Sequence, residues 1–60
     1  MRIVVTFIDD CVAYIEMYEE SNLVSRQTVK PVHAMVWMRK QEKCWTWGYD
    51  ENGHEIAESE

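Results

Sequence analysis

The chain has 60 residues, a formal net charge of −5 at pH 7, and three tryptophans and three tyrosines. This length allows one small domain, residues 1–60, and no stretch approaches the roughly 20 apolar residues of a membrane span. The acidity argues against nucleic acid as a direct ligand, because such affinity rests largely on neutralised phosphates.

The amino-terminal third of the chain contains two predicted elements. Residues Arg2–Ile8 are apolar on both faces of an extended chain, which predicts a strand at the centre of a sheet. Asp9 or Asp10 then stands where the N-cap of a helix would, and apolar residues follow at helical spacing. We therefore expect a helix over residues 10–21, although the same segment also alternates as a strand would.

Pro31 divides the middle of the chain. Leu23–Lys30 before it is polar and is expected to be irregular or a short edge strand. Because proline cannot donate to a sheet ladder, we place the start of a strand there and predict an antiparallel hairpin over Val32–Tyr49. The alternative makes Pro31 the first residue of a helix that runs to Lys43. Apolar residues would surround that helix without forming a stripe, which favours the hairpin.

The strongest short hairpin signal in the chain is Asn52-Gly53, within residues 50–54. Glu55–Ala57 is expected to return as a brief edge strand, and residues 58–60 are expected to fray. The predicted fold is α+β, with a small antiparallel sheet of three to four strands and one helix. The alternative is an all-β meander or an SH3-like barrel, in which residues 11–18 form a strand.

No pattern in the chain predicts catalysis or a bound cofactor. Cys11, His33, Cys44 and His54 are each ten or more positions apart, whereas structural zinc sites pair their ligands at short spacing. No nucleophile motif or glycine-rich phosphate loop is present. We therefore expect no enzyme, no metal and no cofactor, and reduced thiols in a cytoplasmic protein. A disulfide between Cys11 and Cys44 is the alternative.

Acidic and aromatic side chains remain as candidates for binding. On a helix over residues 10–21, Glu16, Glu19 and Glu20 would share one side, with two aspartates at its positive end. Carboxylates presented in this way can occupy a basic groove, and an exposed aromatic ring can anchor the contact. The predicted partner-binding residues are the acidic Asp9, Asp10, Glu16, Glu19, Glu20, Asp50, Glu51 and Glu55 and the aromatic Trp37, Trp45, Trp47 and Tyr49.

The acidic and aromatic residues just named give the chain a distinctive profile. In its small size, acidity and aromatic content, the chain resembles the small inhibitors of host defence that bacteriophages encode, including anti-CRISPR proteins. The resemblance lies in the overall profile and in no shared motif. It implies a non-enzymatic inhibitor in the host cytoplasm, which acts as a nucleic-acid mimic and occludes a basic, nucleic-acid-binding surface of a larger host protein or complex.

Two other functions are open from the sequence. One is a structural or assembly module that docks through its aromatic face, and a homodimer is possible because so short a chain gains stability from a partner. The other is a single-stranded nucleic-acid binder that stacks bases on Trp45, Trp47 and Tyr49, which share one face of an extended strand.

Overall fold

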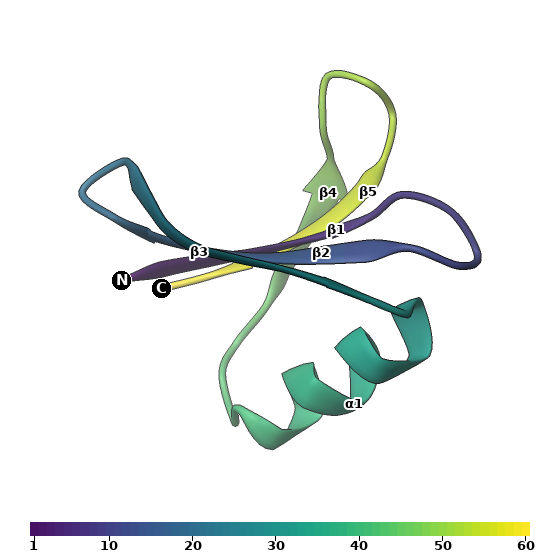
Figure 1. Ribbon diagram of the computed structural model, residues 1–60. Coiled ribbons are helices and arrows are strands. Elements are labelled where there is room, and N and C mark those ends of the chain that lie inside the picture. Colours follow the sequence, from purple (N-terminus) through teal and green to yellow (C-terminus); the bar gives the residue numbers. More distant parts are fainter.

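The computed structural model describes all 60 residues as one five-stranded antiparallel sheet with a single helix on one face (Figure 1). The elements are β1 (Arg2–Phe7), β2 (Ala13–Glu19), β3 (Asn22–Val29), α1 (Pro31–Lys40), β4 (Thr46–Tyr49) and β5 (Glu55–Ser59). The strand order is β3-β2-β1-β5-β4. The predicted α+β class is confirmed, with five strands where three or four were expected.

β1 is the central strand, as its apolar run predicts. It pairs with β2 on one side and with β5 on the other. Ile3 and Val5 are buried on the face that α1 covers, while Val4 and Thr6 lie on the opposite face. Hereafter these are the covered face and the open face. Val5 is the largest side chain that is fully removed from solvent, so the core is small.

Residues Ala13–Glu19 form β2, so the helix predicted over residues 10–21 is wrong and the strand alternative is right. Pairing decides the outcome, because β2 is bonded to β1 on one side and to β3 on the other. Ile15 is buried on the covered face, and its neighbour Tyr14 lies on the open face. The carboxylate of Asp9 caps a turn instead of a helix, since its Oδ1 accepts bonds from the amides of Cys11 (2.7 Å) and Val12 (2.9 Å).

The helix lies at Pro31–Lys40, so the hairpin predicted over Val32–Tyr49 is wrong and the rival helix is right. Pro31 stands in the first turn, where a missing N–H costs nothing. Arg39 and Lys40 occupy the last turn, where positive charge complements the helix dipole. The helix ends three residues before the predicted Lys43.

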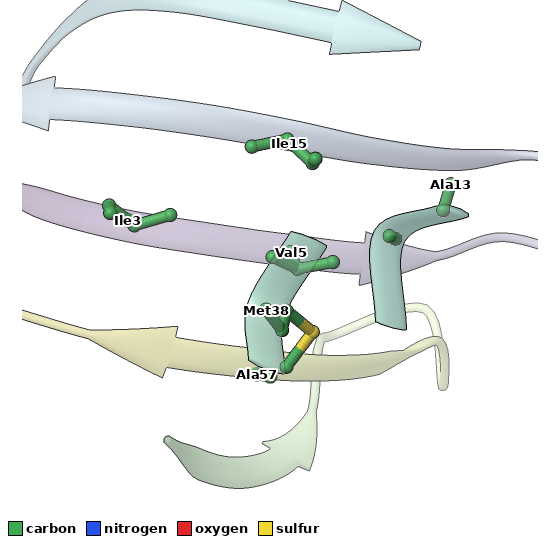
Figure 2. Packing of buried hydrophobic residues seen from close by; sticks show 7 residues of the cluster. Ile3, Val5, Ala13, Ile15, Met38 and Ala57 are labelled. Atoms are coloured by element: carbon green, nitrogen blue, oxygen red, sulfur yellow. The ribbon is translucent and has the colours of Figure 1, made fainter. Parts of the chain in front are cut away.

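The path of the chain explains why one face is covered. β3 and β4 are the two edge strands, and α1 connects them, so the helix must cross the sheet. Ala34 and Met38 project from α1 into the core, and Met38 lies over Val5 and Ala57 (Figure 2). Tight contact is possible because the residues that meet the helix include alanines, which have short side chains.

The β4–β5 hairpin forms at the predicted Asn-Gly turn, where Gly53 has a φ of +83° that favours glycine. β5 lies between β1 and β4, so it is an inner strand and not the expected edge strand. It extends to Ser59, which is buried, so the residues expected to fray belong largely to the sheet. The single helix α1, with 10 residues, falls well short of the length that spans a membrane.

A candidate partner-binding groove

A groove of about 610 Å³ lies between the amino-terminal half of α1 and the β1, β4 and β5 strands. Its apolar walls come from both layers of the molecule, and carboxylates stand on its rim. We call it the aromatic–acidic groove, and its lining residues are Phe7, Asp9, Asp10, Pro31, Val32, Met35, Trp47 and Glu55.

Two stacked aromatic rings form the sheet side of the groove. Trp47 is opposite Ala57 in the β4–β5 ladder, and Ala57 is opposite Val5 in β1. The short side chain of Ala57 leaves room for the indole to reach across β5 to Phe7. The two rings are nearly parallel, with centroids 5.9 Å apart and an interplanar angle of 17°. Trp47 is still 47% exposed, so one part of the ring remains open to a ligand.

Glu55 lies between two aromatic residues on the covered face of the sheet. In the ladders its direct neighbours are Phe7 on β1 and Tyr49 on β4, and Trp47 is a diagonal neighbour. Tyr49 is 73% exposed. Glu55 takes part in neither of the two ion pairs in the molecule, which join Glu16 to Arg26 and Asp50 to His54. A carboxylate without a cation therefore stands beside exposed aromatic surface.

The β1–β2 loop supplies the other two carboxylates of the groove. Asp9 is held in place by the two amides that it caps, whereas Asp10 is exposed and makes no hydrogen bond or ion pair. On the opposite wall, α1 presents Val32, which is 63% exposed, and Met35, which is 38% exposed. The groove thus combines apolar walls with negative charge that the chain itself does not neutralise.

The predicted row of Glu16, Glu19 and Glu20 does not form, because these residues belong to a strand and a turn and not to a helix. Glu16 lies on the open face, where its Oε2 is 3.7 Å from Nε of Arg26. Glu19 and Glu20 lie at the β2–β3 turn, at the end of the sheet away from the groove. They do not contribute to the groove.

The remaining predicted carboxylates, Asp50 and Glu51, lie in the β4–β5 turn at the groove end of the sheet. Asp50 Oδ1 accepts bonds from the amides of Asn52 (3.0 Å) and His54 (2.8 Å), and its Oδ2 is 3.3 Å from Nδ1 of His54. Desolvation acts to raise the pKa of the Asp50 carboxyl, but these hydrogen bonds and the His54 ring outweigh it. The pKa is therefore held below its ordinary value of 3.8.

Two of the four predicted aromatic residues are structural. Trp37 and Trp45 pack against each other with centroids 6.2 Å apart, and both border the buried core. Trp45 Nε1 donates a bond to the carbonyl of Met38, at 3.4 Å. Trp47 and Tyr49 remain exposed on the covered side of the sheet. The surface of three aromatic rings expected for stacking bases is thus reduced to two.

The sequence interpretation missed Phe7, Val32 and Met35 as groove residues. Phe7 was assigned to the core, and the other two were assigned to a strand. One signal could have identified them, namely the apolar residues that surround the segment after Pro31 when it is drawn as a helix. A helix that is apolar on more than one side has surface that its own sheet cannot cover.

Outside the groove, the side chains of the usual metal-binding and nucleophilic residues do not cluster. No group of three or more His, Cys, Asp or Glu side chains could hold a metal ion. Cys11 and Cys44 are both free and exposed. Comparison of the chain with protein-family models, with curated proteins and with solved structures gave no match.

Proposed function

We propose that the protein is a non-enzymatic binding protein that covers a basic surface of a larger target protein through the aromatic–acidic groove. The observation that carries this proposal is the position of Glu55, an unpaired carboxylate with exposed Trp47 and Tyr49 as neighbours. Tryptophan and tyrosine dominate the energetics of protein interfaces, and a nearby carboxylate selects a lysine or arginine of the target.

The distribution of charge supports a basic target. Five carboxylates lie on the loops and strand start at the groove end of the sheet, namely Asp9, Asp10, Asp50, Glu51 and Glu55. Lys30, His33 and His54 are the basic residues of the adjoining segments, against these five carboxylates. Such a field accelerates encounter with a positive surface and makes binding sensitive to salt.

The biological role that fits this chemistry is the one implied by the resemblance to bacteriophage inhibitors. A nucleic-acid-handling complex of the host presents a basic surface for the phosphate backbone, and a small acidic protein with an aromatic anchor would block it. In this proposal the blocking residues are those of the groove end, and Glu16, Glu19 and Glu20 take no part.

Affinity capture from a bacterial lysate, followed by a quantitative binding assay with the captured protein, tests the proposal. Trp47→Ala is expected to weaken binding by about 2 kcal/mol or more, roughly 30-fold. Glu55→Lys is expected to weaken it by a similar amount, and the wild-type affinity is expected to fall steeply as salt rises.

Glu19→Lys is the matched control, since it makes the same charge change on an exposed residue at the far end of the sheet. It is expected to bind within a fewfold of the wild type. Equal losses for Glu19→Lys and Glu55→Lys would show that net charge acts without the groove. Retention on single-stranded DNA in place of a protein would support the nucleic-acid alternative.

A further inference from the structure

The outer side of α1 carries an apolar stripe that nothing in the chain covers. Val32, Met35 and Val36 stand at positions i, i+3 and i+4, so they share one side of the helix. Their exposed fractions are 63%, 38% and 44%, while Ala34 and Met38 on the inner side are buried. We call these three residues the outer stripe.

The two ends of the outer stripe have opposite charge. At its amino-terminal end, Val32 lines the groove together with Asp9, Asp10 and Glu55. At its carboxyl-terminal end stand Arg39 and Lys40, both exposed and in no ion pair. An acidic end, an apolar middle and a basic end follow one another along a single surface.

We propose that the outer stripe is the interface of a homodimer in which the α1 helices of two copies pack antiparallel. A two-fold axis near Met35 and Val36 brings these residues of both copies together. It also places Arg39 of each copy beside Val32 of the other, and hence beside Asp10. The α-helical rise keeps the two Arg39 side chains about 10 Å apart along the axis, so opposite charges meet and like charges do not.

The small core supports a second copy as the occupant. Only 9 of 60 residues are buried, and a core of this size supplies only about 3–5 kcal/mol, to which burial against a second copy would add. Specific complexes bury at least about 600 Å² per copy, which would be roughly a seventh of the 4407 Å² surface, and three side chains with their flanking charges would reach no more than this low end. We therefore expect a dimer of micromolar rather than nanomolar affinity.

The outer stripe and the aromatic–acidic groove share Val32 and Met35, and in the dimer Arg39 of the second copy lies beside Asp10 of the groove. A basic target protein would then displace the second copy, whose Arg39 and Lys40 occupy the same carboxylates. This exchange rests on the proposed function, but the dimer itself does not. In the dimer each copy thus covers part of the groove of the other, and a target protein must displace one copy before it can bind.

Sedimentation velocity with a charge-swapped pair tests the dimer. The wild type is expected to pass from monomer to dimer between about 5 and 500 μM, a range that brackets a Kd of about 50 μM. Arg39→Glu and Asp10→Lys are each expected to weaken the dimer about tenfold or more, because each places like charges together at both ends. An equimolar mixture of the two variants is expected to dimerise. In the mixed dimer the introduced glutamate meets the introduced lysine at one end, and the native Arg39 and Asp10 meet at the other.

Glu19→Lys is again the control and is expected to dimerise as the wild type does. Val36→Asp, at an exposed position, is expected to be monomeric with an unchanged circular dichroism spectrum. A wild type that stays monomeric throughout, or a mixture that does not dimerise, would overturn the proposal. NMR amide shifts that change with protein concentration should lie on residues 32–39. Such shifts on β3, the edge strand away from the groove, would also overturn the proposal. None of these results would alter the target-binding test with Trp47→Ala and Glu55→Lys.

Discussion

The two faces of the sheet differ in how their charged and aromatic side chains are satisfied. On the open face, Arg26 lies over the ring of Tyr14 at 4.2 Å and pairs with Glu16, and Arg2 lies over Tyr18 at 5.2 Å. On the covered side, Trp47, Tyr49 and Glu55 are exposed or unpaired at the edge of the helix. Arg2, Arg26 and Glu16 on the open face thus have partners within the chain, whereas Glu55 at the groove end has none.

This difference separates structure from binding. A guanidinium that stacks on a tyrosine and pairs with a carboxylate has few free donors for a ligand, so Arg26 serves the fold and not a binding site. An unpaired carboxylate next to exposed aromatic rings adds nothing to the fold that we can identify. The groove end is therefore the part of the molecule where a second molecule gains most.

The two faces are expected to differ most in how much a substitution on β2 lowers the free energy of unfolding, because two neighbouring residues of this strand lie on opposite faces. Ile15 is 3% exposed on the covered face, and Ile15→Ala is expected to cost about 2–4 kcal/mol through the cavity that it leaves. That is close to the whole stability of so small a domain. Tyr14→Ala, on the open face, is expected to cost about 1 kcal/mol by loss of its contact with Arg26.

Urea denaturation, followed by circular dichroism, measures both changes. Equal destabilisation by Tyr14→Ala and Ile15→Ala would contradict the difference between the faces, because the open face would then be a second core. The midpoint of the Ile15→Ala transition is expected to lie so low that part of the protein is unfolded without denaturant.

The sequence predicted β1 and the β4–β5 hairpin, because each carries a local signal that tertiary contacts only reinforce. An apolar run on both faces belongs at the centre of a sheet, and Asn52-Gly53 fits a turn that needs positive φ. The β2–β3 hairpin was missed because its turn lacks glycine. Glu20 and Ser21 adopt φ values of 50° and 76°, which such residues seldom occupy, so Ser21-Asn22 marks the end of an element but does not predict a tight hairpin.

The site was predicted only in part for a related reason. Asp9, Asp10, Glu55 and Trp47 were proposed as binding residues and do line one groove. Their neighbours Val32 and Met35 could not be placed, because the apolar residues after Pro31 were interpreted as the two faces of a strand. The same pattern describes a helix with one side in the core and one side without a cover within the chain.

A smaller effect on the free energy of unfolding is expected from removing Arg26, which has partners within the chain, or Glu55, which has none. Arg26→Ala removes an ion pair and a stacking contact, but Arg26 is half exposed, so screening limits the loss to about 0.5–1 kcal/mol. Glu55→Gln removes a carboxylate without a cation, and the free energy of unfolding is expected to stay within about 0.5 kcal/mol of the wild type. Thermal unfolding at low and high salt measures both, and only the Arg26→Ala difference should shrink with salt.

The β4–β5 turn refines the comparison, because Asp50 lies at the groove end and yet is satisfied within the chain. Its pKa is lowered in the folded state, so the carboxylate stabilises the turn above its ordinary pKa of 3.8. That contribution is lost as the pH falls below 3.8 and through the folded value. Amide exchange at Asn52, Gly53 and His54 is expected to lose protection, relative to the rest of the sheet, between about pH 5 and pH 2.

Asp50→Asn keeps an oxygen for the two backbone amides but cannot titrate, so its turn should show no such transition. A transition that persists in Asp50→Asn would mean that another group controls the turn.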